Sequence, residues 1–383
     1  MQPSTIREVH DFAQQLLLED PARKLLSLHF GESDQGTPAF IVEAAVQALR
    51  NGAVFYENNG GREDLKQALV EFYHRQHGVE LSPAHFVVTC GATQAILLTM
   101  LATLVPGDEV FNITPNWPNF TEAARISGAI VREVPLVFDE AGSVFQLDMA
   151  ELEKRIVAAD APRMVVVNSP SNPTGWIIST GQQEQLFRLC VKHGLLLLSD
   201  EIYDRIIFND ERSPTALKLS NDLDHLVVVN GFSKTYCMTG WRLGYLITTP
   251  QRAAQMARMQ EFVVSHAPSM AQVAAIAALR DGEPFIASSL ERYRGLRQLV
   301  SEQLGALPGA RVARTEGSFY AFFKIPAAAD SVAFCQQLVK ETGVVLAPGS
   351  AFGAGGEGWL RLCFANTPER LTSAIEKIHQ LMT

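Results

Sequence analysis

The sequence predicts an α/β protein with a large domain, in which a mostly parallel central sheet is covered by helices, and a smaller α/β domain. Two observations support this prediction. Short, continuously apolar segments alternate with segments of helical periodicity through the middle of the chain, which is typical of parallel strands buried on both faces. The length of 383 residues exceeds one ordinary domain, and 47% hydrophobic with 19% charged residues allow a substantial core.

The elements of the large domain follow one another in a regular order. An apolar strand is predicted at residues 86–90, and a helical pattern at residues 91–104 follows it directly. A further amphipathic helix is predicted at residues 148–159. The other predicted strands are residues 109–113, 129–134, 164–168, 195–199 and 226–230. Ligands bind at the carboxyl ends of strands in such sheets, so motifs directly after these segments carry most weight.

The last hundred residues predict a second sheet. Residues 318–324 and 359–364 have the pattern of strands, and an amphipathic helix ends the chain. We therefore expect a large domain at residues 36–275. The small domain is expected to combine residues 1–35 with residues 276–383.

Composition excludes several classes of function. A net charge of −9 argues against a nucleic-acid surface, and no apolar segment is long enough to span a bilayer. The N-terminus carries charges where a signal peptide needs an apolar stretch, so we expect a cytoplasmic protein. Five cysteines without a CxxC pair and nine scattered histidines predict neither a disulfide framework nor a metal site.

The most specific motif lies at residues 231–244, where Lys234 follows the predicted strand at residues 226–230. A lysine forms Schiff bases once its amine is partly neutral, which desolvation and neighbouring cations favour. Arg242 is a candidate for such a cation and for a phosphate ligand. A single lysine in a loop is more often a surface residue, so this motif alone does not decide the function.

Three further motifs follow predicted strands. Asp200 is placed to pair with a protonated pyridine nitrogen, although an isolated aspartate more often caps a helix. Asn172 lies in an Asn-Pro turn and has an amide that can donate to a cofactor oxygen. Residues 91–93 lie where a strand passes into a helix, a position that presents free backbone N–H groups to a phosphate.

Together these motifs resemble the class I and II aminotransferases, which are fold-type I enzymes dependent on pyridoxal phosphate (PLP). The resemblance covers nearly the whole chain. Its most specific part is Ser-Lys followed, after five residues, by Gly-Trp-Arg-x-Gly. In chain order, the matching pieces are residues 31–34, Tyr56 with Gly60 and Leu65, residues 91–93, Trp117, residues 168–175, residues 200–203, residues 233–242 and Arg361.

The resemblance implies a role for each matching residue. Lys234 is expected to carry PLP as a Schiff base and to move the proton between the substrate Cα and the cofactor. Asp200 is expected to pair with the pyridine nitrogen, and Tyr203 and Asn172 to hydrogen-bond the phenolic oxygen. Arg361 is expected to hold the substrate α-carboxylate in a bidentate pair. The other implied contacts are Gly91, Ala92, Thr93, Ser233 and Arg242 at the phosphate, Trp117 stacked on the ring, Tyr56 at the phosphate of a neighbouring subunit, and Gly31 with Asn172 and Trp117 at the substrate.

The implied activity is exchange of an amino group between an L-amino acid and a 2-oxo acid in a ping-pong reaction. Because Tyr56 is expected to serve the partner subunit, a homodimer with shared sites is implied. A C–S lyase or an aminocyclopropane-carboxylate-synthase-like enzyme needs the same lysine, aspartate and arginine, so elimination stays an alternative. A non-enzymatic PLP-binding sensor domain is a more distant one, because the chain keeps every catalytic residue.

The segments expected near the substrate are poor in cations. Residues 261–270 contain no Lys or Arg, residues 112–120 are uncharged, and Thr93 stands where acid-specific relatives often have Lys. Burying a second carboxylate without a partner costs several kcal/mol. We therefore expect a neutral, aliphatic or aromatic amino donor, with aspartate a poor one. His266 is a candidate pocket residue. Glu57 is compatible with binding of a basic amino donor.

Overall fold

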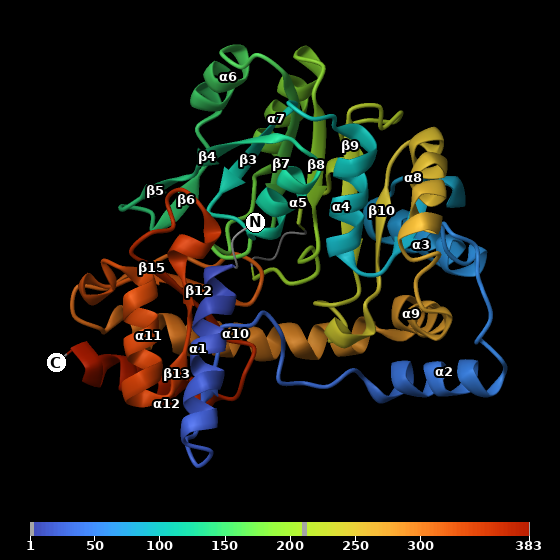
Figure 1. Cartoon of the computed structure of the whole chain (residues 1–383). Coiled ribbons are helices and arrows are strands. Elements are labelled where there is room, and N and C mark those ends of the chain that lie inside the picture. Colours follow the sequence, from blue (N-terminus) through green and yellow to red (C-terminus); the bar gives the residue numbers. More distant parts are fainter. Residues whose placement is uncertain (1–3, 209–212, 383) are drawn as a thin grey trace.

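The computed structural model describes residues 4–208 and 213–382, and its largest sheet has seven strands (Figure 1). Within those residues β10 runs antiparallel to both of its neighbours, and the other six strands run in one direction. The order across the sheet is β2 (Phe86–Thr89), β10 (Gly244–Ile247), β9 (Leu226–Gly231), β8 (Leu196–Asp200), β7 (Pro162–Asn168), β3 (Glu109–Thr114) and β4 (Ile130–Pro135). The predicted mostly parallel sheet is confirmed.

Every strand predicted for this sheet is present, with ends shifted by at most two residues. The antiparallel strand β10 is not among the predicted strands. It has four residues, and an apolar segment that short fits a strand or a helix equally well. A small hairpin of β5 (Val137–Asp139) and β6 (Val144–Gln146) is also additional to the prediction.

Helices cover both faces of the large sheet, as the continuously apolar strands predict. Val165 and Val167 of β7 point into one hydrophobic core, whereas Met164 and Val166 point into another on the opposite face. The first core includes α3 (Glu63–His77), α6 (Met149–Val157), α7 (Thr180–Lys192) and α9 (Ser269–Asp281), and the second includes α4 (Ala92–Thr103), α5 (Asn119–Ile126) and α8 (Pro250–Val263). Packing from both sides fixes the positions of the strand ends.

A second, antiparallel sheet is built from the C-terminal part of the chain. Its order is β11 (Arg311–Val312), β12 (Tyr320–Lys324), β15 (Trp359–Cys363) and β14 (Ala347–Pro348). The helices around it are α1 (Thr5–Glu19), α11 (Ser331–Thr342) and α12 (Pro368–Met382). The strands predicted at residues 318–324 and 359–364 and the predicted C-terminal helix are thereby confirmed.

The N-terminal segment packs against the end of the chain. In Figure 1, α1 in blue lies beside α11 in orange. Strand β1 (Leu26–Ser27) pairs in parallel with β13 (Val344–Val345). These contacts support the proposal that residues 1–35 belong with the C-terminal region.

Packing partners change sharply near the expected domain boundary. Helix α9 packs on α2 (Ala39–Arg50) and α3 of the large domain. The next helix, α10 (Glu283–Gly305), packs mainly on α12, β11 and β12. We therefore propose that the boundary lies at Gly282, close to the expected residue 276. Among the described residues, no helix is long and apolar enough to cross a membrane.

Candidate active site

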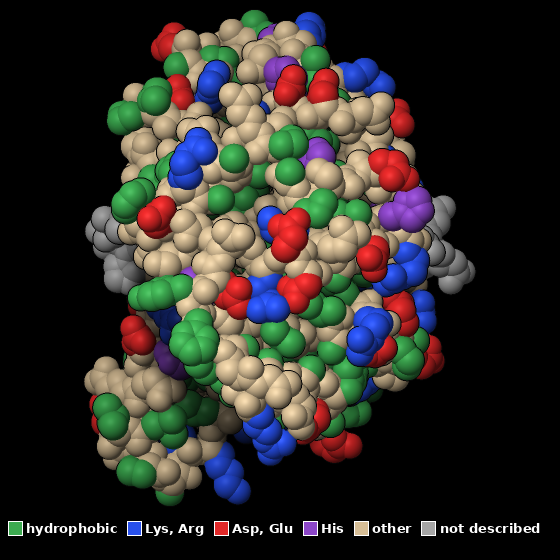
Figure 2. Space-filling view, turned by 90° about the vertical axis from the view of Figure 1, so that its right-hand side faces the viewer, with side chains coloured by type: hydrophobic (Ala, Val, Ile, Leu, Met, Phe, Trp, Pro, Cys, Tyr) green, Lys and Arg blue, Asp and Glu red, His purple; other side chains and the backbone are tan. Residues whose placement is uncertain are grey.

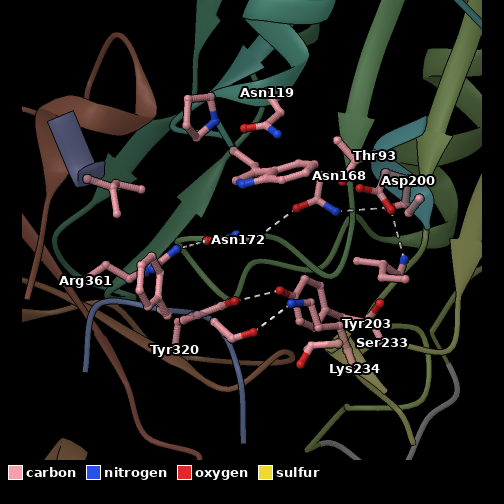
Figure 3. A pocket seen from close by; sticks show the side chains of 18 of the residues that line it. Thr93, Asn119, Asn168, Asn172, Asp200, Tyr203, Ser233, Lys234, Tyr320 and Arg361 are labelled. Atoms are coloured by element: carbon pink, nitrogen blue, oxygen red, sulfur yellow. Dashed lines mark hydrogen bonds between the residues drawn. The ribbon is translucent and has the colours of Figure 1, made fainter. Parts of the chain in front are cut away.

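A cavity of about 360 Å³ lies between the carboxyl ends of the large sheet's strands and the small domain. Its size falls within the range of small-molecule sites, roughly 300–1,000 Å³. Figure 3 shows that Asp200, Lys234, Tyr203 and Arg361 lie around this one space. The cavity brings together the following predicted site residues: Gly31, Ala92, Thr93, Trp117, Asn172, Asp200, Tyr203, Ser233, Lys234, Arg242 and Arg361.

Lys234 lies just after β9, where the chain leaves the sheet. Its Nζ donates a hydrogen bond of 2.7 Å to the carbonyl oxygen of Gly31. Burial lowers the pKa of the Lys234 amine to about 8. Since a lysine is nucleophilic only when neutral, this burial makes a reactive amine available near neutral pH.

Asp200 is the last residue of β8, and its side chain is buried at the wall of the cavity. One carboxylate oxygen accepts a hydrogen bond of 3.0 Å from the backbone N–H of Ile202. Burial raises the pKa of Asp200 to about 7. A carboxylate held this way favours a cationic partner in the cavity, because a nearby positive charge stabilises its ionised form.

One end of the cavity is suited to an anion. Helix α4 begins at Ala92, and among the described residues no side chain caps its N-terminus. The guanidinium of Arg242 lies beside this turn, and its Nη1 donates to the carbonyl oxygen of Thr239 over 2.9 Å. Gly91 has φ +85°, and a Cβ there would come within 2.6 Å of Arg242 Nη2, so glycine is required for this close approach. Free backbone N–H groups, the helix dipole and an arginine together favour a phosphate.

The opposite end of the cavity contains Arg361, which is buried in the middle of β15. Its Nη1 donates to Oδ1 of Asn172 over 2.9 Å, and its Nη2 donates to the carbonyl oxygen of His29. Within the described part of the chain, Nε has no hydrogen-bond partner and no carboxylate pairs with the guanidinium. A buried guanidinium that cannot lose its proton is a strong site for a carboxylate ligand.

A hydrogen-bonded pair of phenols connects the two domains across the cavity. The hydroxyl groups of Tyr203 and Tyr320 are 2.7 Å apart, and burial raises the pKa of both phenols, so both stay protonated (Figure 3). A Cβ on Gly31 would lie 1.9 Å from the Tyr320 hydroxyl, so only glycine lets the N-terminal segment pass here. Because Oδ1 of Asn172 accepts from Arg361, its Nδ2 is the group left to donate into the cavity.

Several residues of the cavity wall have no role assigned in the sequence prediction, although Asn168, Ile202 and Thr239 lie inside its motifs. Asn168 and Ile202 lie at the ends of β7 and β8, so the rule that ligands bind at strand ends would have included them. Tyr320 and the residues of α1 lie in segments that carry no motif. The full set is Ser4, Ile6, Arg7, His29, Phe30, Pro118, Asn119, Asn168, Ile202, Thr239 and Tyr320.

Gly91, the N-cap of α4, is not among the lining residues, and three further predicted or candidate residues lie outside the cavity of their own chain. Tyr56 is 90% exposed, and its ring meets His266 edge-on with centroids 5.8 Å apart. His266 itself does not line the cavity. Glu57 forms an ion pair of 2.6 Å with Arg62, which leaves it engaged within its own loop. Their roles therefore depend on whether a second subunit is present.

The residues around the cavity fit PLP on chemical grounds. An aldehyde needs an amine of lowered pKa, a pyridine nitrogen needs a carboxylate, and a phosphate needs N–H donors and a cation. Lys234, Asp200 and the turn beside Arg242 supply these groups around one cavity. Among residues 4–208 and 213–382, no cluster of three or more His, Cys, Asp or Glu could hold a metal ion.

Comparisons with known proteins agree with this chemistry. The family model "Aminotransferase class I and II" matches residues 23–378. Aspartate aminotransferase from Thermotoga maritima is 35% identical over 94% of this chain and 91% of its own length. Aromatic-amino-acid aminotransferase 2 from Thermococcus litoralis is 32% identical over 99% of this chain and 96% of its own length.

The fold matches as well as the sequence. The solved structure of aspartate aminotransferase from Thermus thermophilus with maleate has a TM-score of 0.91 at 33% identity, covering 100% of this chain and 97% of that chain. These relatives are aminotransferases, and they do not favour the lyase or sensor alternatives. The chain therefore belongs to the class I and II aminotransferases and is a PLP-dependent enzyme of that family.

Proposed function

We propose that the enzyme exchanges the amino group of a neutral, aliphatic or aromatic L-amino acid with a 2-oxo acid in a ping-pong cycle. The observation that carries this proposal is that buried Asp200, half-buried Lys234 and buried Arg361 all line one cavity. The three groups match the three needs of the reaction: a partner for the pyridine nitrogen, an amine near neutrality, and a cation for the α-carboxylate.

In this proposal each side chain of the site has its own role in the reaction. PLP, when bound, supplies a pyridine ring that withdraws electrons from the substrate's α-carbon. Lys234 takes the proton from that carbon through its Nζ, whose pKa of about 8 suits a base near neutral pH. Asp200 would pair its negative charge with the ring nitrogen. Arg361 orients the substrate by its α-carboxylate, which positions the α-hydrogen for Lys234.

The remaining site residues would hold the cofactor and orient the substrate. Ser233, Arg242 and the turn at residues 91–93 would bind the phosphate, with Trp117 against the ring. Tyr203 would donate to the phenolic oxygen, and its bond to Tyr320 fixes the direction of its hydroxyl. Asn172 would donate to the same oxygen, since its other amide atom is already held by Arg361. Because Gly31 has no side chain, the N-terminal segment can lie over the substrate.

We propose a homodimer in which Tyr56 completes the phosphate site of the partner subunit. Val54, Phe55 and Tyr56 are 63%, 78% and 90% exposed, and Phe262 and Val263 at the end of α8 are 87% and 56% exposed. Figure 2 faces the side of the molecule that carries α2, α3 and α8, where hydrophobic side chains lie on the surface between charged ones. Such exposure is unusual for a monomer and supports burial against a second copy.

The substrate preference is supported by the apolar part of the cavity wall. Ile6, Phe30, Trp117 and Ile202 offer contacts for an aliphatic or aromatic side chain. A cytoplasmic location is supported by the cysteines. All five lie within the described residues and are unpaired, which is usual in a reducing compartment.

Product analysis tests this proposal against elimination. The holoenzyme is incubated with phenylalanine, methionine or cysteine, with and without an added 2-oxo acid. We expect amino-group transfer that depends on the 2-oxo acid, and no more than traces of ammonia. Release of ammonia and pyruvate from cysteine as the main reaction would instead assign the enzyme to the lyases.

A further inference from the structure

The first turn of α1 forms part of the cavity wall. Ser4, Ile6 and Arg7 line the cavity, although the rest of α1 packs on the small domain. The Cζ atom of Arg7 lies 5.3 Å from the centroid of the Phe30 ring, and Phe30 lines the cavity as well. None of the ion pairs formed by the described residues involves Arg7. Arg7 is therefore a cation at the cavity with no acidic partner.

The charges of the cavity wall do not balance without a ligand. Three cations, Lys234, Arg242 and Arg361, already have roles in the proposed function. Asp200 is the one carboxylate among the lining residues of the described chain. PLP phosphate and the substrate α-carboxylate account for Arg242 and Arg361. Arg7 is left as a further positive charge that neither of these anions needs.

The surroundings of Arg7 leave its charge uncompensated. Glu8, the next residue, accepts a hydrogen bond of 3.3 Å from Gln336 on α11, so its carboxylate is directed to the small domain. Burial, with further effects from His10, Arg361 and Arg7 in decreasing order, lowers the pKa of His29 to about 3. His29 is therefore neutral and adds no charge beside either arginine. The uncapped N-terminus of α1 adds a partial positive charge on the same side.

We propose that Arg7 is a specificity-determining residue that binds the distal carboxylate of a dicarboxylic amino acid or 2-oxo acid. This inference rests on the proposed function, because it takes the α-carboxylate to be held by Arg361. A substrate held there extends its side chain within the cavity shared by Phe30 and Arg7. A neutral side chain packs on the apolar wall, and a carboxylate reaches the guanidinium. A ping-pong enzyme uses one pocket for two substrates in turn, so a neutral donor and an acidic acceptor are compatible.

The proposal revises one premise of the sequence analysis. Residues 112–120 and 261–270 contain no Lys or Arg. The cation comes instead from the N-terminal helix, whose position at the cavity depends on packing against α11 near the end of the chain.

Equilibrium binding provides the first test. Glutarate and pentanoate have the same number of carbons but differ by one carboxylate, so their affinities for the holoenzyme isolate the second charge. We expect wild type to prefer glutarate, and Arg7→Gln to lose about tenfold of that preference. This size lies between an exposed ion pair and a buried charged hydrogen bond. Arg188→Gln on α7, an arginine whose side chain is 67% exposed and lies away from the cavity, is the matched control and should change nothing.

Half-reaction rates provide the second test. The ratio of kcat/KM for glutamate and aspartate to that for phenylalanine should fall about tenfold in Arg7→Gln and recover in part in Arg7→Lys. A ratio that changes less than about twofold, or a wild type that does not prefer glutarate over pentanoate, overturns the assignment of Arg7. A wild type that transaminates no neutral amino acid, such as phenylalanine, would instead overturn the proposed function, so the two failures are distinguishable.

Discussion

The two walls of the cavity differ in origin and in how tightly they are built. The large-domain wall consists of strand ends and a helix start, with Asp200 and the strands around it fully covered by helices. The facing wall combines α1, the segment at residues 29–31 and Arg361 of the small domain, which come from opposite ends of the chain. The sheet therefore fixes the residues of the chemistry, whereas substrate selection depends on contacts between distant segments.

We therefore expect substitutions on the two walls to differ in the size and kind of their effects. Changes on the large-domain wall should abolish the reaction for every substrate. Changes on the facing wall should alter which substrate is used while PLP stays bound.

The largest effect is expected for Lys234→Ala. Wild type should be yellow, with an absorption band that sodium borohydride abolishes, and the variant should lose this behaviour. Removing a positioned base alone costs about 10²–10⁴-fold in rate, and here the covalent link to the cofactor is lost as well. Single-turnover rates with phenylalanine provide the measurement. Normal transamination by the variant would show that the large-domain wall does not carry the chemistry.

A smaller effect is expected for Arg361→Lys on the facing wall. A lysine cannot reproduce the bidentate contact, and losing one charged hydrogen bond costs roughly 1.5–3 kcal/mol, or about ten- to a hundredfold in substrate binding. Absorption of the bound cofactor should stay unchanged, because Arg361 lies away from the phosphate end. Titration of binding by difference spectra checks both points. An unchanged kcat/KM would remove Arg361 from the substrate site.

The sequence predicts the residues of the large-domain wall better than those of the facing wall. Lys234, Asp200 and Asn172 follow apolar strands, so local pattern and the strand-end rule suffice to place them at one edge. Arg7, His29 and Tyr320 have no such local signal. The positions of Arg7 and His29 follow from the pairing of β1 with β13 and the packing of α1 on α11, which are contacts between residues more than three hundred positions apart. The position of Tyr320 follows from the pairing of β12 with β15. No sequence pattern specifies such contacts without an alignment.

A Tyr56 variant tests whether a second subunit supplies a third wall of the cavity. Lys234→Ala chains and Tyr56→Ala chains should each be impaired, the second by less, since it lacks only one phosphate contact. Mixing the two should restore activity, because one site of a hybrid dimer regains both residues. Recovery is measured as transamination rate against the mixing ratio. If hybrid dimers form, as shown with differently tagged chains, and no activity returns, the shared site is wrong.

The smallest effect concerns stability, and it separates the large-domain wall from the facing wall without any substrate. Burial raises the pKa of Asp200 from 3.8 to about 7. The folded apoenzyme therefore binds more protons than the unfolded chain between those two pH values, and its stability falls as pH rises from about 4 to about 7.

An amide at this position carries no charge to bury. Asp200→Asn should accordingly melt a few degrees higher than wild type at pH 7, with the difference fading toward pH 4. The matched change on the facing wall, Arg7→Gln, removes an exposed charge that is the smallest of the causes lowering the pKa of His29, so the pH profile of melting should change much less than in Asp200→Asn. Thermal unfolding of the apo forms at several pH values makes the measurement. Parallel profiles for wild type and Asp200→Asn would mean that the carboxylate is solvated in the absence of cofactor, so that burial at this wall does not hold Asp200 ready for a cation.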